Sequence, residues 1–198
     1  MNLPNKLTAS RFVITAAFLL VLFAQIPWNA TIALVLFCLA GVTDFLDGTI
    51  ARRRNLITNF GILMDPLADK IMVCSAFIAF VGLQWMPAWM VVIIVARELS
   101  ITGLRLLAAS KHVVLAAERF GKHKTISQIT AINAIFVWVI VGQNQWGSAG
   151  QLIFGWNLFG KPWVWWFMEG AKWVAVTLTF SSGWLYLWRN RALYLDDM

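Results

Sequence analysis

Eight residues between positions 44 and 69 form a pattern of acidic, small and basic side chains at fixed spacing. The pattern reads D-x-x-D-G-x-x-A-R, then eight positions, then G-x-x-x-D-x-x-x-D, and its members are Asp44, Asp47, Gly48, Ala51, Arg52, Gly61, Asp65 and Asp69. Four of the chain's nine acidic residues are therefore concentrated in one stretch, between apolar runs long enough to cross a membrane. An ionisable side chain at membrane depth is costly, so a functional role is the first explanation to test.

The four aspartates have the spacing and the chemistry of a divalent-metal site. Asp44 and Asp47 are three residues apart, and Asp65 and Asp69 are four apart, so each pair lies on one face of a helix. A short basic loop makes the two helices antiparallel neighbours, so the acidic faces can meet near the cytoplasmic surface. Converging carboxylates need cations to offset their repulsion, and oxygen ligands without Cys or His favour Mg²⁺ or Mn²⁺. We expect two ions, because such pairs clamp the oxygens of a phosphoryl displacement.

The remaining motif residues suit a phosphate-bearing ligand. Gly48 and Ala51 lack bulk one helical turn apart, so a ligand can lie against the helix, and Arg52 offers a fork of donors to phosphate oxygens. In the alternative interpretation, Arg52 to Arg54, Lys70 and Arg97 neutralise the acids and hold helices together. That role does not require small residues at fixed spacing, so the pattern favours a metal and phosphate site.

The composition indicates the kind of scaffold that positions this motif. Of 198 residues, 60% are apolar and 13% charged, and the mean hydropathy is +0.72, whereas soluble domains are roughly half apolar and about a quarter charged. We predict one all-α integral membrane domain over residues 1–198. Its six transmembrane helices are expected near residues 8–26, 30–51, 62–83, 88–109, 125–142 and 164–187.

The net charge of +7 follows the expected topology. With the N-terminus in the cytoplasm, only Lys161 falls in an outer loop, and both termini are cytoplasmic. The basic residues expected on the cytoplasmic side are Lys6, Arg11, Arg52, Arg53, Arg54, Lys111, Arg119, Lys122, Lys124, Arg189 and Arg191. This bias explains the charge without a nucleic-acid partner, and predicts a multi-pass protein of the cell (inner or plasma) membrane with its active site at the cytoplasmic face. The long connection 143–163 predicts a short interfacial helix, to which the sequence assigns no role.

The motif resembles, at every defined position, the signature of the CDP-alcohol phosphotransferase family, and the six-helix pattern agrees with that family's fold. The resemblance implies transfer of a phosphatidyl or similar group from a CDP-linked donor to an alcohol, with release of CMP. It makes four aspartates the ligands of two divalent ions: Asp44, Asp47, Asp65 and Asp69. It also makes Asp69 the general base for the acceptor hydroxyl. Residues implied to line the CDP pocket are Gly48, Ala51, Arg52 and Gly61, with Arg52 on the diphosphate.

Residues outside the motif are candidates for binding the acceptor. Fragments that resemble phosphatidylglycerophosphate synthases within the family are Ala96-Arg97-Glu98 with Leu104-Arg105, Gly121-Lys122 with Lys124-Thr125 and Gln128, and Leu3-Pro4-Asn5 with Leu7-Thr8 and Arg11. The residues that could hold the phosphate of a dianionic acceptor are Arg97, Arg105, Lys122 and Lys124. Alternatively, Arg97 is an intramembrane charge paired with Glu98 or a motif aspartate, and the two lysines are ordinary interfacial residues.

The sequence thus predicts an enzyme that joins CDP-diacylglycerol to sn-glycerol 3-phosphate, giving phosphatidylglycerophosphate and CMP. An inositol phosphate, phosphatidylglycerol or serine is an alternative acceptor within the family, and a basic pocket favours phosphorylated acceptors over serine. A divalent-cation transporter is the alternative from another class. Transporters usually bind ions near the midplane between repeated halves, whereas these aspartates lie at cytoplasmic helix ends. The resemblance also suggests a homodimer.

Overall fold

The structure, a computed structural model, describes residues 3–54, 59–111, 113 and 120–195. Within its helices the side chains of the following residues are not described: 3–9, 44–54, 59–66, 69, 120–122, 192 and 195. The described chain is helical apart from one two-stranded hairpin, so the prediction of an all-α protein is confirmed.

Six long helices coincide with the apolar ranges expected from the sequence. They are α1 (Leu3–Phe23), α2 (Asn29–Arg54), α3 (Asn59–Gly82), α4 (Ala88–Ser110), α5 (Phe120–Gly142) and α7 (Trp163–Arg189). A four-residue helix, α8 (Ala192–Leu195), follows α7. Among the described residues, His123–Gly142 is long and apolar enough to cross a membrane, and Ser10–Phe23, Asn29–Thr43 and Lys70–Gly82 are shorter apolar helices.

The connection between α5 and α7 contains α6 (Gly147–Phe154) and a hairpin of β1 (Asn157–Leu158) and β2 (Lys161–Pro162). The short helix expected between residues 143 and 163 is therefore present as α6. The antiparallel hairpin was not predicted; it pairs Asn157 with Pro162 and Leu158 with Lys161. We call residues 147–162 the cap.

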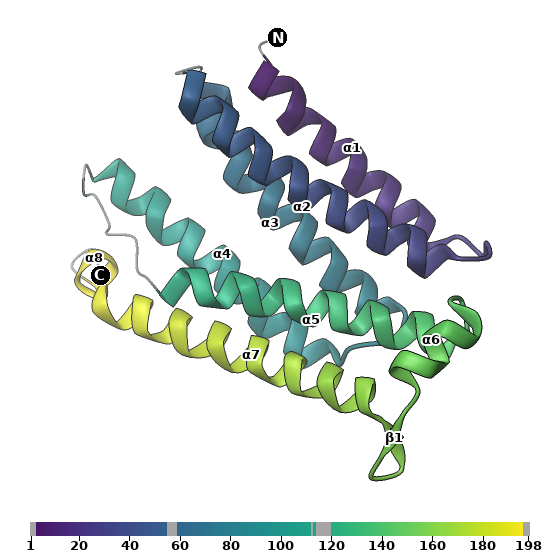
Figure 1. The fold of residues 1–198 in the computed structure, drawn as a ribbon. Helices are drawn as coiled ribbons and strands as arrows, with labels where there is room; N and C mark the ends of the chain where they lie inside the picture. The colour runs from purple at the N-terminus through teal and green to yellow at the C-terminus, as the bar shows by residue number, and fades with distance from the viewer. Residues whose placement is uncertain (1–2, 55–58, 112, 114–119, 196–198) are drawn as a thin grey trace.

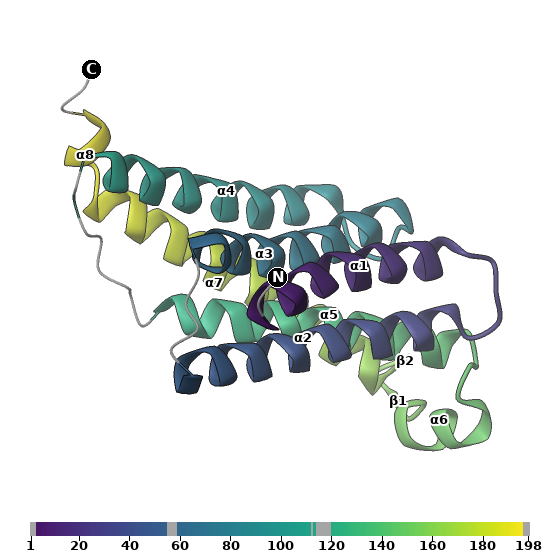
Figure 2. The same cartoon turned by 90° about the horizontal axis from the view of Figure 1, so that it is seen from above.

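The helices pack in two groups that meet through α5 and through the contact of α3 with α4. Helix α1 packs on α2 and α3, α7 packs on α5 and α4, and α5 also contacts α2 and α3. Both termini lie toward the end of the molecule opposite to the cap, and α2 and α3 diverge from α4 and α5 toward that end (Figure 1). Figure 2 shows α1, α3 and α4 along one side and α2 and α5 along the other.

Four buried phenylalanines form the aromatic centre of the core. Phe18 of α1, Phe37 of α2, Phe80 of α3 and Phe136 of α5 each have no more than 5% of their surface exposed. The ring centroids of Phe80 and Phe136 are 5.2 Å apart at 77°, and those of Phe18 and Phe136 are 6.1 Å apart at 77°, which is the edge-to-face arrangement aromatic pairs prefer. Because each ring comes from a different helix, this cluster joins α1, α2, α3 and α5.

Candidate active site

The motif aspartates lie on two helices that run in opposite directions (Figure 1). Asp47 is seven residues before the end of α2, and Asp65 is six residues after the start of α3. Asp44 and Asp69 are each ten residues from those same helix ends. At about 1.5 Å of rise per residue, the two acidic pairs therefore stand at matching heights along antiparallel helices.

That placement fits a pair of divalent cations. Matched heights are one condition for carboxylates from two helices to share ions, and a donor set made only of oxygens suits Mg²⁺ or Mn²⁺. The side chains of the four aspartates and of Gly48, Ala51, Arg52 and Gly61 lie outside the described residues. The metal site and the CDP pocket therefore stay predictions, supported by the helix positions alone.

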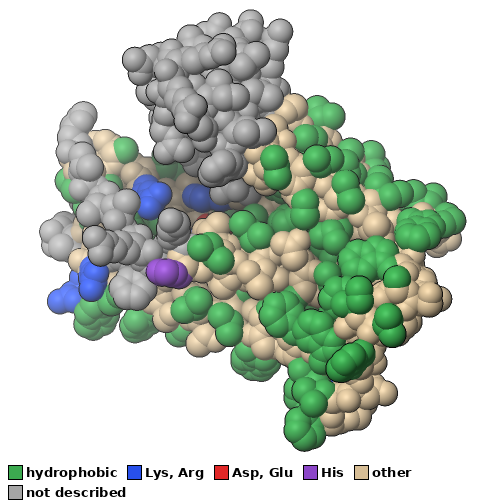
Figure 3. All heavy atoms as spheres, viewed as in Figure 1, with side chains coloured by type: hydrophobic (Ala, Val, Ile, Leu, Met, Phe, Trp, Pro, Cys, Tyr) green, Lys and Arg blue, Asp and Glu red, His purple; other side chains and the backbone are tan. Residues whose placement is uncertain are grey.

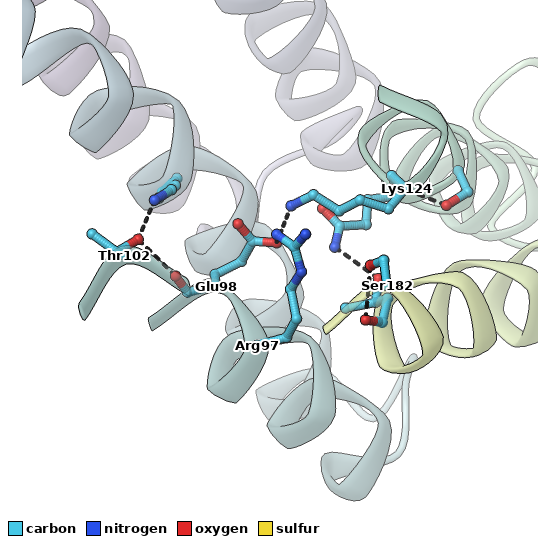
Figure 4. Close-up of polar contacts among 9 residues, drawn as sticks. Arg97, Glu98, Thr102, Lys124 and Ser182 are labelled. Carbon is cyan, nitrogen blue, oxygen red and sulfur yellow. Dashed lines mark hydrogen bonds and ion pairs between the residues drawn. The ribbon is translucent and has the colours of Figure 1, made fainter. Parts of the chain in front are cut away.

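Beside these helices, three charged side chains meet between α4 and α5. The Arg97 guanidinium and the Lys124 ammonium both point at the carboxylate of Glu98 (Figure 4). The Arg97 Nη1 donates to Glu98 Oε1 at 3.2 Å, and Lys124 Nζ donates to the same oxygen. Glu98 is 5% exposed and Lys124 is 7% exposed. The structure therefore brings together Arg97 and Lys124, two of the four residues predicted to bind the acceptor phosphate. Both contact the Glu98 carboxylate, so the three side chains together carry one net positive charge.

Arg97 keeps hydrogen-bonding capacity beyond its bond to Glu98. Its Nε is buried and has no hydrogen-bond partner among the described residues. A buried donor without a partner is costly, and a guanidinium carries five N–H donors in a fixed fork. This group is therefore able to take an anionic oxygen of a ligand.

A second set of contacts ties this cluster to the helix that carries Asp65 and Asp69. Lys70, on α3, donates its ammonium to the Thr102 hydroxyl of α4. The Thr102 hydroxyl in turn donates to the Glu98 carbonyl at 2.7 Å. Because Lys70 directly follows Asp69, the helix of the motif and the helix of Arg97 are joined at the level of the predicted site.

Helix α7 closes the cluster from the other side. The Gln128 amide of α5 donates to the Thr179 hydroxyl at 3.0 Å, and both residues are buried. Gly183 lies against Arg97, because a Cβ at position 183 would stand 2.7 Å from Arg97 Cγ. A glycine is therefore required at this point for the Arg97 stem to lie between α4 and α7.

The other two predicted acceptor residues are placed differently. Arg105 is exposed, about 12 Å further along α4 than Arg97, and its guanidinium lies 6.0 Å from the centre of the Tyr186 ring. Lys122 has no described side chain. Figure 3 shows Lys and Arg side chains on one face of the molecule at this end.

Sequence reasoning missed several members of this cluster. Thr102, Thr179 and Gly183 carry no charge and belong to no motif. The useful signals were the four-residue spacing of Glu98 and Thr102 on one helix face and the position of Lys70 next to the last aspartate. Arg11 was assigned to the cytoplasmic side and to the resembling N-terminal fragment, and the structure shows that it is buried.

The family model for CDP-alcohol phosphatidyltransferases matches residues 1–163. The chain belongs to this family, as the motif predicted.

Relatives in three bacteria carry one name, CDP-diacylglycerol--glycerol-3-phosphate 3-phosphatidyltransferase. The Bacillus subtilis protein is 39% identical over 96% of this chain and 95% of its own length. The Cereibacter sphaeroides and Escherichia coli K12 proteins are each 32% identical, over 99% of this chain and 98% of their own lengths.

Proposed function

We propose that the protein transfers the phosphatidyl group of CDP-diacylglycerol to sn-glycerol 3-phosphate, giving phosphatidylglycerophosphate and CMP. The observation that carries the proposal is its similarity, over nearly the whole chain, to relatives named for this reaction. The cluster of Arg97, Glu98 and Lys124 supports the choice of a phosphorylated acceptor, because it holds a buried net positive charge with donors to spare.

The motif residues would supply the donor side of the site. Asp44, Asp47, Asp65 and Asp69 would hold two divalent ions, Mg²⁺ or Mn²⁺, which when bound polarise a diphosphate and neutralise charge on departing CMP. Arg52 would hold the diphosphate oxygens, with Gly48, Ala51 and Gly61 leaving room for the nucleotide. Asp69 would take the proton from the acceptor hydroxyl as that oxygen attacks the donor's β-phosphorus.

Residues of α4 and α5 would hold the acceptor. Arg97 and Lys124 would bind the phosphate of glycerol 3-phosphate, with Glu98 keeping both cations in place. The Lys70–Thr102 contact would keep this phosphate site at a fixed distance from the helix of Asp69. With the acceptor phosphate and the diphosphate both held, the hydroxyl is positioned for attack, which supplies much of the catalysis of such reactions. Arg105 and Lys122 remain candidates for drawing the acceptor toward the site.

We propose that the chain lies in the inner or plasma membrane, with six spans, both termini cytoplasmic and the active site at the cytoplasmic face. The helix positions support this topology, as does the concentration of basic residues at one end. A homodimer is part of the proposal on family resemblance.

The test is CMP release by purified protein with CDP-diacylglycerol and Mg²⁺, comparing glycerol 3-phosphate, serine and an inositol phosphate as acceptors. We expect turnover with glycerol 3-phosphate alone, and none after a chelator removes the metal. Turnover with the inositol phosphate and none with glycerol 3-phosphate would overturn the acceptor. Divalent-cation flux into liposomes that is independent of any CDP-lipid would instead support a transporter.

A further inference from the structure

The cap has features that the transfer reaction does not require. Its hairpin leaves the start of α7 sideways, across the helix axes rather than along them (Figure 1). In the proposed topology it lies at the outer surface of the membrane. An element directed across the helix axes at that level runs parallel to the membrane plane.

The cap exposes large apolar side chains. Phe159 is 87% exposed, Leu152 73% and Trp156 72%, and Ile153 and Leu158 are also exposed. Aromatic residues with other large apolar residues on a short surface element are typical of segments that enter the boundary between headgroups and acyl chains. In water the same surface would be an unfavourable apolar patch.

Three backbone carbonyls of the cap accept hydrogen bonds from indole N–H groups. The indole N–H groups of Trp156, Trp163 and Trp166 donate to the carbonyls of Leu152 (2.6 Å), Ile153 (3.1 Å) and Leu158 (2.9 Å) respectively. The Leu152 and Ile153 carbonyls belong to the last turn of α6, where a helix leaves carbonyls without internal partners. Water would satisfy these groups in solution, whereas in lipid they need partners from the protein.

The turn of the hairpin holds its largest side chain, Phe159, on an unfavourable backbone conformation. Phe159 and Gly160 form a two-residue turn with φ values of 51° and 79°. Turns with two positive φ values favour Asn-Gly, because bulky residues rarely adopt the left-handed region. A phenylalanine at this exposed tip is unfavourable in water and is explained by an apolar surrounding.

Lys161 supplies the polar side of the same arrangement. It is exposed, and its ammonium lies 5.6 Å from the centre of the Trp165 ring. A cation beside an aromatic ring suits the phosphate level of a bilayer, directly above an apolar tip.

We propose that the cap is an anchor that inserts into the outer leaflet of the lipid bilayer, with Leu152 and Phe159 below the headgroups and Lys161 at the lipid phosphates. This inference rests on the proposed membrane topology. Its partner is the lipid itself, rather than a second copy of the chain or another protein.

The test measures depth in the membrane directly. In full-length protein with Cys38 and Cys74 replaced by Ala, a nitroxide is attached to Leu152→Cys or Phe159→Cys, and to Asn144→Cys, an exposed residue of the turn before α6, as the matched control. In phosphatidylglycerol and phosphatidylethanolamine liposomes, relaxation by oxygen is compared with relaxation by a water-soluble nickel chelate. We expect oxygen to dominate at 152 and 159, and the nickel chelate to dominate at 144.

Equal nickel accessibility at all three positions would overturn the anchor. Dipolar broadening at 159 that disappears on dilution with unlabelled protein would overturn it in favour of a second copy. CMP release is measured on the same samples. Labels that are accessible to nickel in protein that releases CMP would overturn the anchor but not the proposed reaction. Labels that are buried in lipid in protein that releases no CMP would overturn the proposed reaction but not the anchor.

Discussion

The charged cluster between α4 and α5 and the cap at the opposite end meet the same physical problem in different ways. Both contain polar groups that need partners, which are buried in the cluster and exposed in the cap. In the cluster, two cations share one carboxylate and Arg97 Nε is left without a partner. In the cap, indole N–H groups bind the free carbonyls, with no charge involved. The comparison teaches that the buried charges of the cluster keep a spare donor for a ligand, whereas three carbonyls of the cap take neutral donors from the protein itself.

The largest effect should come from the catalytic side of this comparison. Asp69→Asn removes the proposed general base and a metal ligand, so we expect CMP release to fall by roughly 10³-fold or more. Glu169→Gln, an equivalent change on α7 far from the motif, is the control and should leave turnover per folded protein within about twofold. Retained activity in Asp69→Asn would assign the base to another residue.

Removing the shared carboxylate should destabilise the cluster. Glu98→Gln leaves two buried cations without their anion, and we expect a loss of about 3 kcal/mol in unfolding free energy, measured by thermal unfolding in detergent. Ser127→Ala removes a neutral buried hydroxyl from the same region of α5 and should cost about 1 kcal/mol or less. Equal losses in the two variants would mean that the charges of the cluster contribute no more to stability than a neutral hydroxyl does.

A smaller change tests the position of Arg97. Gly183→Ala forces the Arg97 stem to move, and we expect the KM for glycerol 3-phosphate to rise about tenfold, or about 1.4 kcal/mol, while kcat changes little. Gly170→Ala is the matched control on α7, since no atom lies within 4 Å of its added Cβ. A KM rise confined to CDP-diacylglycerol would place Arg97 on the donor instead.

The smallest effect is expected in the cap. Trp166→Phe keeps an aromatic ring but removes the hydrogen bond to the Leu158 carbonyl. We therefore expect the unfolding free energy to fall by about 1 kcal/mol, with turnover unchanged. Trp184→Phe is the control. Trp184 is an exposed residue of α7, and its indole donates to none of the described residues. An equal response of both variants would mean that the indole bond does not hold the hairpin.

The sequence predicted the helices because their signal is local. Apolar runs of near-constant length anticipated α1 to α5 and α7, and eight motif residues anticipated the family, which the match over residues 1–163 confirms. The pairing of Arg97 with Glu98 was stated only as an alternative, in which Glu98 or a motif aspartate was the partner of Arg97.

Contacts between distant, uncharged residues were not predictable. Gly183 matters only because α7 passes over Arg97, and Gln128 meets Thr179 from 51 positions away. The hairpin was not predicted for a different reason. A phenylalanine in a left-handed turn contradicts the residue preferences by which such turns are recognised.

The divergence of α2 and α3 from α4 and α5 bears on how the donor would arrive (Figure 1). The aromatic cluster joins α1, α2, α3 and α5, whereas the motif lies toward the end at which α2 and α3 diverge from α4 and α5 (Figure 1). A donor that keeps its acyl chains in the bilayer would approach the motif from the side, by diffusion in two dimensions. The encounter rate would then follow the mole fraction of donor in the membrane, so diluting it with inert lipid would slow turnover even at constant bulk concentration.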